Sequence, residues 1–243
     1  MRALIASDIH SNLEAFQSVI DGATSNGGFD EIWSLGDLVG YGPDPAACID
    51  LLREHKNRSV AGNHDLASIG KLSLEAFNAH AKVANLWTGK QLNEDQTQFL
   101  AGLELKLEIE EFTVVHGSPR DPIWEYVVSV GAAVASFLHF DTYWCLVGHS
   151  HIPFICRPDE NGAVFLEFPL DSPVTLSTNR LIINPGGVGQ PRDGDPRASY
   201  AIFDSNADTV THHRAEYDIP KTQEKMKERG LPTFLIDRLE QGR

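Results

Sequence analysis

Arg2-Ala3-Leu4-Ile5-Ala6-Ser7-Asp8-Ile9-His10 opens the chain with a short apolar run that stops at a carboxylate and an imidazole. The apolar run predicts a buried β-strand over residues 2–6. If Asp8 and His10 lie on extended backbone, alternation by two places both side chains on one face, whereas a helix would separate them. Because a metal ion needs convergent lone pairs, this spacing predicts a metal site at the end of a strand.

Glycines and metal-binding side chains recur together where other apolar runs end. The five motifs are Asp8-Ile9-His10, Gly36-Asp37, Gly62-Asn63-His64-Asp65, His116-Gly117 and Gly148-His149-Ser150-His151. Ligands collect at the carboxyl ends of strands in open α/β sheets, where loops carry side chains over the rim. The glycines suit turns with unusual dihedrals or a close approach of the backbone to the ions. The motifs therefore predict one centre that holds two metal ions.

The donor set of these motifs restricts the kind of metal. It contains imidazole, carboxylate and one amide oxygen but no thiolate, which favours Mn²⁺, Fe, Zn²⁺, Co²⁺ or Ni²⁺ over Ca²⁺ and leaves the choice among them open. Asp8 and Asp37 are the only carboxylates, so two divalent ions would leave a formal local charge of about +2. A small phosphate ester is therefore an acceptable ligand.

The segments between the motifs alternate between strand and helix patterns, first as β-α-β-α and later as a strand-rich region. The predicted strands are 2–6, 31–35, 58–61, a hairpin over 107–115, 143–147, 163–167, 180–183 and 199–203. The predicted helices are 13–23 with Asn12 as its N-cap, 45–54, 74–92, 94–103, 130–139, 221–229 and 232–239. With no linker or repeat, residues 1–243 are expected to form a single domain with two β layers between helices.

The composition is that of an acidic globular protein. The 34 acidic and 20 basic residues give a formal charge of −14, and no Lys/Arg cluster is present, so long nucleic acid is not an expected partner. No apolar stretch approaches the ~20 residues of a membrane span, and Asp8 stops the first apolar run before it could serve as a signal sequence. We therefore expect a cytoplasmic protein with no membrane contact. Three cysteines without a CxxC pair argue against a disulfide framework or a thiolate zinc site.

The ordered motifs D-x-H, G-D, G-N-H-D, H-G and G-H-x-H resemble those of the calcineurin-like metallophosphoesterase superfamily. Two further segments are similar to its bacterial YfcE-type phosphodiesterase branch, namely Asn184-Pro185-Gly186-Gly187-Val188-Gly189-Gln190-Pro191-Arg192 and Gly230-Leu231-Pro232. The resemblance covers nearly the whole chain. It implies an α/β (α+β) fold built as a four-layer α/β/β/α sandwich, with two central mixed β-sheets flanked by helices. It also implies a phosphoester hydrolase in which a hydroxide between two ions attacks phosphorus.

The same resemblance assigns the site residues one by one. One ion would be bound by Asp8, His10, Asp37 and His151, and the second by Asp37, Asn63, His116 and His149, so that Asp37 bridges. His64 is not needed as a ligand, and by family analogy it would protonate the leaving alkoxide or orient the phosphate. Its own orienting partner is left open by the sequence.

Each assignment has a simpler structural alternative. Asp8 could cap the following helix, although Asn12 fills that position better, and Asn63 or Asp65 could serve a turn. His149 and His151 could be solvated residues of an exposed strand. These alternatives require several coincidences in the right order, so metal binding is the favoured interpretation.

Two residues near the motifs are candidates for contact with the substrate. Arg120 could touch a phosphate or pair with Asp121, and Tyr41 could line the pocket or pack under it. Arg192 and Arg197 are expected mainly to brace the fold through Asp193 and Asp195.

Gly40-Tyr41, shortly after Asp37, bears on whether the substrate is a phosphodiester or a phosphomonoester. Protein phosphatases and symmetrical diadenosine tetraphosphatases of the superfamily typically continue this motif with Asp-Arg, whereas Gly40-Tyr41 stands here. The missing arginine would grip a monoester, so we expect a phosphodiesterase acting on a small or nucleotide-derived phosphoester. The alternatives are a phosphomonoesterase, a diadenosine-polyphosphate hydrolase or a protein phosphatase. A non-catalytic scaffold of the same fold is disfavoured because His64 is present, and no segment indicates an oligomeric state.

Overall fold

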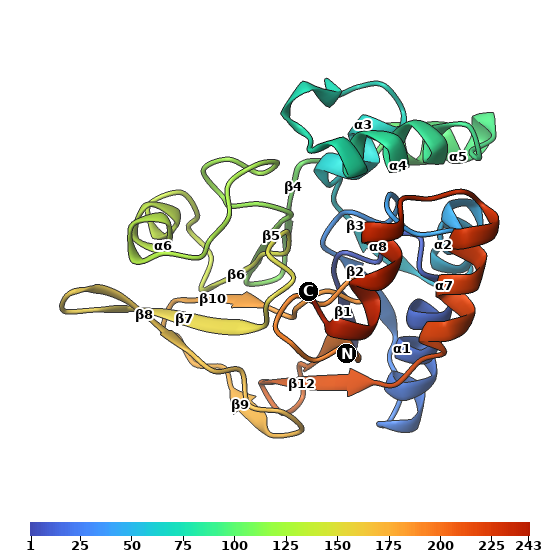
Figure 1. The fold of residues 1–243 in the computed structure, drawn as a ribbon. Helices are drawn as coiled ribbons and strands as arrows, with labels where there is room; N and C mark the ends of the chain where they lie inside the picture. Colours follow the sequence, from blue (N-terminus) through green and yellow to red (C-terminus); the bar gives the residue numbers. More distant parts are fainter.

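Two six-stranded β-sheets form the centre of the computed structural model, which describes residues 1–243 (Figure 1). The first sheet has the order β3 (Asn57–Ser59), β2 (Glu31–Ser34), β1 (Arg2–Ala6), β11 (Ala198–Asp204), β12 (Thr209–Ala215) and β9 (Pro173–Thr175). The second has the order β4 (Lys106–Ile109), β5 (Phe112–Val115), β6 (Trp144–Leu146), β10 (Leu181–Asn184), β7 (Phe154–Asp159) and β8 (Gly162–Leu166).

Both sheets are mixed. In the first, β1, β2 and β3 are parallel, while β11 runs antiparallel to β1. In the second, β5, β6 and β10 are parallel, while β4 and β7 pair antiparallel at either side of them. The predicted class of two mixed sheets flanked by helices is therefore confirmed.

Eight α-helices complete the architecture. They are α1 (Leu13–Ser25), α2 (Pro45–Arg53), α3 (Asn63–Ser68), α4 (Ala79–Gly89), α5 (Glu94–Ala101), α6 (Val130–Phe137), α7 (Ile219–Glu228) and α8 (Thr233–Asp237). Asn12 caps α1 as predicted, because its side chain accepts a hydrogen bond from the backbone N–H of Ala15. No helix combines the length and the apolar character that crossing a membrane would require.

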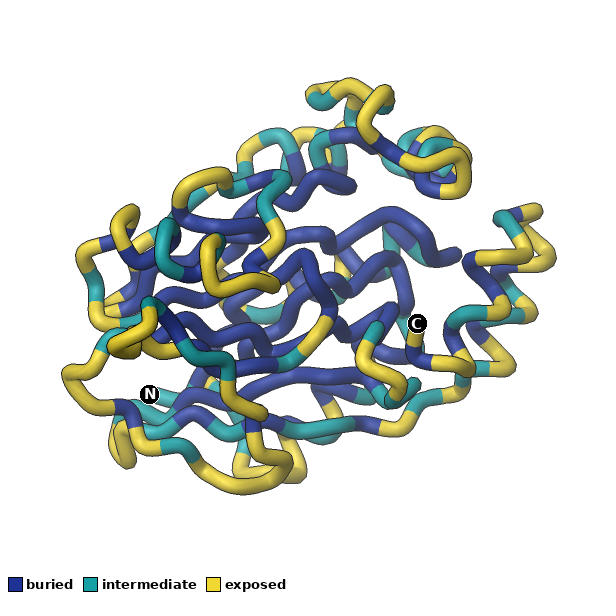
Figure 2. Tube along the Cα trace, turned by 60° about the vertical axis from the view of Figure 1, so that its left-hand side comes forward, coloured by how far each residue is buried: buried dark blue, intermediate teal, exposed yellow.

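The apolar residues of the strands divide between the layers by simple alternation. In β1, Leu4 and Ala6 pack with α1 and α2, whereas Ala3 and Ile5 face the space between the two sheets. The outer face of the second sheet packs against Ala133 and Phe137 of α6. Burial of each large side chain contributes roughly 1.5–3 kcal/mol. Figure 2 shows the resulting buried interior and the exposed outer loops.

Several predicted elements differ in their extent. The helix expected over 74–92 is a 3₁₀ turn, Leu74–Ala76, followed by α4, because the Asn78 side chain accepts from the Ala81 N–H and starts a new helix. Strands β7, β9 and β12 were not predicted, since their polar residues obscure the alternation. Helix α3 was also missed, although it begins inside the motif Gly62-Asn63-His64-Asp65.

Candidate metal centre

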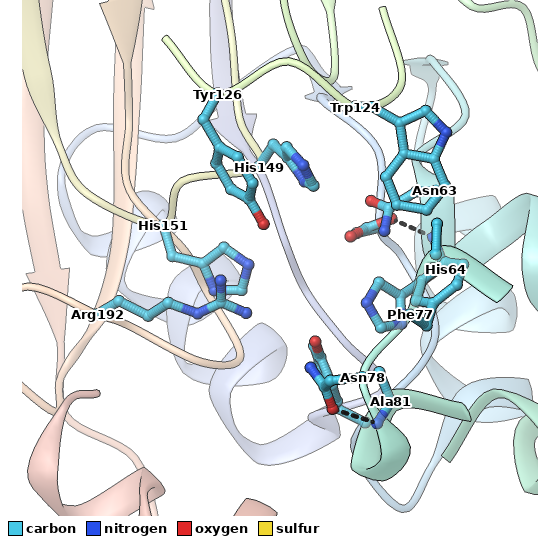
Figure 3. Close-up of a pocket in the computed structure, with 13 residues that line it drawn as sticks. Asn63, His64, Phe77, Asn78, Ala81, Trp124, Tyr126, His149, His151 and Arg192 are labelled. Atoms are coloured by element: carbon cyan, nitrogen blue, oxygen red, sulfur yellow. Dashed lines mark hydrogen bonds between the residues drawn. The ribbon is translucent and has the colours of Figure 1, made fainter. Parts of the chain in front are cut away.

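All seven predicted ligands meet at one buried site, part of which is drawn in Figure 3. Asp8, Asp37 and Asn63 follow β1, β2 and β3, while His116 and His149 follow β5 and β6. Both sheets therefore contribute, through the loops after their parallel strands. The most exposed of the seven, His149, has only 4% of its surface accessible.

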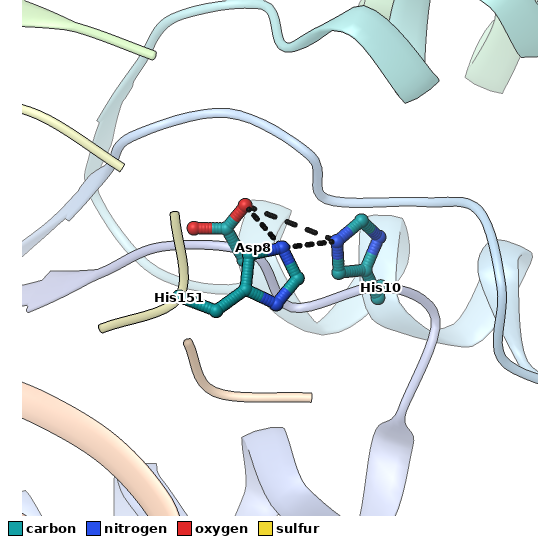
Figure 4. A group of neighbouring side chains, drawn as sticks. All are labelled: Asp8, His10 and His151. Atoms are coloured by element: carbon teal, nitrogen blue, oxygen red, sulfur yellow. Dashed lines mark hydrogen bonds and ion pairs between the residues drawn. The ribbon is translucent and has the colours of Figure 1, made fainter. Parts of the chain in front are cut away.

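The first group consists of Asp8, His10 and His151 (Figure 4). The Nε2 atoms of His10 and His151 lie 3.2 Å apart. Asp8 Oδ1 is 3.1 Å from His151 Nε2 and 3.8 Å from His10 Nε2. Three potential donor atoms therefore face one point.

The second group consists of Asp37, His116 and His149, with Asn63 beside them. His116 Nε2 lies 3.3 Å from Asp37 Oδ2, 3.1 Å from His149 Nδ1 and 3.0 Å from Asn63 Oδ1. The resemblance assigns these four side chains to the second ion, and the structure brings them together.

Asp37 lies between the two groups. Its Oδ2 atom is 3.3 Å from His116 Nε2 in one group and 3.7 Å from His10 Nε2 in the other. Its Oδ1 atom accepts a 2.8 Å hydrogen bond from the backbone N–H of His64, which fixes the carboxylate. A carboxylate held in this way has the position that a bridging ligand requires.

Backbone carbonyls set the tautomers of three histidines. Nδ1 of His10, His116 and His151 faces the carbonyl oxygens of Val39, Leu35 and Gln190, at 3.2, 2.9 and 2.5 Å. Since a carbonyl only accepts, each Nδ1 carries a proton, and each Nε2 faces the centre, where it can bind an ion through its lone pair whenever the ring is neutral.

Those lone pairs fit a cation. Two unprotonated Nε2 atoms at 3.2 Å cannot hydrogen-bond to each other. Asp8 Oδ1 is also buried without a hydrogen-bond partner, and such orphaned groups are uncommon in folded proteins. Divalent ions would satisfy these atoms, so the residues present fit a dinuclear site.

Burial keeps most of the imidazoles neutral. It lowers the pKa of His149 to about 3 and also lowers the pKa values of His10 and His151. Burial opposes ionisation of Asp8 as well, but His151 outweighs it and the pKa of Asp8 falls. At His116 burial is outweighed by Asp37, which raises the pKa to about 9, so a bound ion would displace a proton there.

The pairs Asp8/His10 and His149/His151 do not lie on extended backbone, which corrects the geometry expected from the sequence. Asp8, His10, Asp37, His149 and His151 have φ values of 54°, 49°, 51°, 63° and 59°. Such left-handed conformations are uncommon outside glycine and cost about 1–3 kcal/mol each. The side chains converge because tight turns follow the strands, and the pairs do not share an extended face.

The glycine of the third motif is required by packing. A Cβ on Gly62 would lie 2.0 Å from Asp37 Oδ1 and 2.3 Å from the Asp37 backbone nitrogen. The loop after β3 therefore approaches the central carboxylate more closely than any other residue would permit.

His64 is held by a residue that the sequence did not single out. Its Nδ1 lies 3.0 Å from Oδ1 of the buried Asn85 in α4, and Ser68 Oγ donates to the same oxygen. Asp65 is not the partner, since its carboxylate accepts from the backbone N–H groups of Gly62 and Val39. Burial lowers the pKa of His64 to about 4. Asn85 gives no sequence signal because a helical amide 21 positions away belongs to no motif.

The pocket above the centre has aromatic walls (Figure 3). The Tyr41 ring lies 4.2 Å from the His64 ring, so Tyr41 lines the pocket. Tyr126 stacks on His149 at 3.9 Å between ring centroids, while Phe77 and Trp124 meet edge to face at 5.1 Å. The reacting group of a substrate would thus lie among aromatic rings.

Two arginine expectations are corrected. Arg120 is an exposed residue that pairs with Glu125, which is neither of its two predicted contacts, and it does not line the pocket. Arg192 does line the pocket, whereas Arg197 pairs with Asp195 as expected. Asp193, the expected partner of Arg192, pairs with Arg214.

The sequence and fold match known proteins along their length. A family profile described as "Calcineurin-like phosphoesterase superfamily domain" matches residues 1–208. The chain is 49% identical to a metallophosphoesterase from Sphaerobacter thermophilus, with a TM-score of 0.91 over 100% of this chain and 99% of the other. It is 40% identical to the uncharacterized protein MJ0912 of Methanocaldococcus jannaschii, over 98% of this chain and 97% of that protein.

More distant relatives bear on the subgroup. A symmetrical bis(5'-nucleosyl)-tetraphosphatase from Erwinia tasmaniensis is 38% identical over 69% of this chain and 64% of its own length. The structure of YfcE, a phosphoesterase from E. coli, matches with 18% identity and a TM-score of 0.45 over 89% of this chain and 100% of the other. The predicted resemblance to the YfcE-type branch is therefore only distant.

Proposed function

The chain belongs to the calcineurin-like phosphoesterase superfamily, whose enzymes are metal-dependent, and on this premise we propose that it hydrolyses a small or nucleotide-derived phosphodiester. The observation that carries the proposal is the position of Asp37 between two groups of buried donor atoms. Asp8, His10 and His151 would hold one ion, Asn63, His116 and His149 the other, and Asp37 both. The thiolate-free set suits two transition-metal ions, among them manganese, iron, zinc, cobalt and nickel.

Bound ions would lower the pKa of a water and stabilise the attacking and leaving oxygens of an in-line displacement. The chain supplies the geometry. Carbonyl oxygens of Val39, Leu35 and Gln190 orient three imidazoles, and the His64 N–H orients Asp37.

His64 is the proposed proton donor to the leaving oxygen. It lines the pocket beside the two groups, and its ring is fixed by Asn85 and by contact with Tyr41. Because Nδ1 faces an amide oxygen, Nε2 is the atom available to the substrate. Because Nδ1 already carries a proton, Nε2 can donate only from the imidazolium form, which burial disfavours and the negative charge of Asp37 favours. In that form it would protonate the departing alkoxide or hold a phosphate oxygen.

The preference for diesters is supported by the residues that follow Asp37. Gly40 packs against His64, because a Cβ there would lie 2.6 Å from His64 Nδ1. Tyr41 occupies the space beside His10 and His64 with a neutral ring. Neither residue offers the guanidinium that would grip the additional charge of a monoester.

The function is tested with a substrate screen on metal-supplemented protein. The substrates are bis-p-nitrophenyl phosphate, p-nitrophenyl phosphate, cyclic nucleotides, diadenosine polyphosphates and a phosphopeptide. We expect about two transition-metal equivalents per chain and a higher kcat/KM for the diester than for the monoester. Absence of metal together with absence of hydrolysis after Mn²⁺ addition would reject the enzymatic proposal, and faster monoester hydrolysis would reverse the preference.

A further inference from the structure

Arg192 is a cation without a carboxylate partner in an acidic protein. The chain has 34 acidic and 20 basic residues, and the neighbouring Arg197 and Arg214 form ion pairs with Asp195 and Asp193. Arg192 forms no ion pair, and its Nε atom is buried without a hydrogen-bond partner. An unneutralised guanidinium of this kind is suited to an anion.

The position of Arg192 is fixed relative to the metal centre. Its backbone N–H donates to the carbonyl of His151 at 3.3 Å. Gln190 holds both side chains, since its carbonyl faces His151 Nδ1 at 2.5 Å while its side-chain oxygen accepts from Arg192 Nη2 at 2.9 Å. The guanidinium is therefore anchored to the same short loop that orients a proposed ligand.

The guanidinium is directed into the pocket. Figure 3 shows Arg192 beside His151, with His64 and Phe77 on the opposite side. Tyr126 lines the same pocket, where its ring stacks on His149. A phosphoryl group at the centre would thus have the proposed proton donor on one side and a fixed cation on the other.

The number of anionic oxygens on a phosphoester determines whether it can form a contact with Arg192 in addition to its contacts with the two ions. A diester has two unesterified oxygens on phosphorus, and two ions can bind both. A guanidinium forms its strongest charge-assisted hydrogen bond with an anionic oxygen whose charge is not already neutralised by an ion. Such an oxygen exists on a monoester, or on a second phosphate joined to the reacting one.

We propose that Arg192 is a specificity-determining residue that binds an anionic phosphate oxygen beyond the two held at the metal centre. The proposal rests on the proposed function and specifies the class of phosphoester that the site favours. Substrates that carry the additional oxygen gain a contact at Arg192, and simple diesters do not.

The catalytic test compares Arg192→Gln with wild type, both loaded with metal. The control is Arg197→Gln, which removes a guanidinium from the same region that is paired with Asp195. For Arg192→Gln we expect kcat/KM to fall about 10–100-fold toward p-nitrophenyl phosphate or diadenosine tetraphosphate, and to change less than about threefold toward bis-p-nitrophenyl phosphate. The substrate with the larger loss identifies whether the oxygen belongs to a monoester or to a second phosphate.

A binding measurement decides the proposal without turnover. Titration of the metal-loaded proteins with inorganic phosphate should give a Kd at least about tenfold weaker for Arg192→Gln than for wild type and Arg197→Gln. An unchanged phosphate Kd, or an equal loss of kcat/KM on all three esters, overturns the proposal. Should wild type hydrolyse no ester while phosphate affinity depends on Arg192, the proposed function fails and the anion site stands. If Arg192→Gln does not fold, Arg192→Lys, which loses the planar fork, is compared instead and should show the same selective loss.

Discussion

Nδ1 of His64 and Oδ1 of Asn85 lie 3.0 Å apart in the buried wall of the pocket. The acceptor is a neutral amide, so it fixes the ring and its tautomer without placing a negative charge beside it. Ser68 Oγ donates to the same oxygen and holds the amide in turn. Asn85 is therefore a positioning residue that acts through His64.

Asn85→Leu should slow hydrolysis while leaving metal content unchanged. It removes the acceptor for His64 Nδ1, and loss of a buried hydrogen bond of this kind corresponds to about 1–3 kcal/mol, or roughly a tenfold to hundredfold lower kcat. Asn85→Asp keeps an acceptor and adds a charge, which should raise the pKa of His64 and move the pH–rate profile upward in pH. Identical pH profiles for wild type and Asn85→Asp would show that the contact is structural only.

His64→Asn should separate metal binding from catalysis. The backbone N–H that orients Asp37 is retained, so the variant should bind the same metal equivalents as wild type. Its kcat for an ester with an alkoxide leaving group should fall about 10²–10⁴-fold, because the leaving oxygen loses its proton donor. The fall should be smaller for a p-nitrophenolate ester, which needs less protonation. Unchanged turnover of the alkoxide ester would remove His64 from the proposed mechanism.

The side chains proposed as metal ligands could be grouped from the sequence because each lies within a few residues of the end of a strand, and strand ends can be located from the local apolar pattern. Asp8 and Asp37 could be singled out without knowledge of tertiary packing. Asn85 and Arg192 could not, since α4 and the loop after β10 reach the pocket only through long-range packing. The left-handed backbone conformation of Asp8 and His10 could not be predicted from the sequence either, because neither residue type requires a positive φ.

The predictions for Arg120 and for the helix over 74–92 were wrong because of single side-chain hydrogen bonds or ion pairs that the sequence pattern does not reveal. Arg120 follows His116 closely in sequence, but its guanidinium forms an ion pair with Glu125 outside the pocket. The interruption of the helix expected over 74–92 depends on a capping hydrogen bond from Asn78, which competes with a continuous apolar pattern. Nearness in sequence thus grouped the side chains proposed as metal ligands, but it did not place Arg120 in relation to the pocket.

Gly62→Ala should damage the metal centre, whereas Gly131→Ala should not. The new Cβ at position 62 would lie 2.0 Å from Asp37 Oδ1, so the central carboxylate must move. We expect a lower melting temperature and weaker metal retention. Gly131 in α6 has open space around its Cβ position and should gain about 0.5–1 kcal/mol in the free energy of unfolding. Metal analysis after dialysis and thermal melts of both variants provide the comparison. Equal metal retention by the two would contradict the packing argument.

His212 should make the fold less stable in mild acid. It is buried, with Nε2 2.8 Å from Ser199 Oγ and Nδ1 3.2 Å from the carbonyl of Phe168. Burial, with a smaller contribution from Arg214, lowers its pKa to about 4. The unfolded chain, with a pKa near 6.5, takes up the proton first as the pH falls, so the penalty is absent above about pH 6.5 and grows as the pH falls toward 4.

The matched variant for this titration is His212→Gln, which keeps a hydrogen-bonding side chain but cannot be protonated. Wild type should lose about 1 kcal/mol more than the variant in free energy of unfolding between about pH 7.5 and pH 5.5. Denaturant melts of metal-loaded protein at the two pH values measure this difference, and the comparison cancels the contributions of histidines that both proteins share. Equal losses in the two proteins would show that His212 does not titrate with folding, because a residue whose pKa is the same in both states cannot alter the slope of stability against pH.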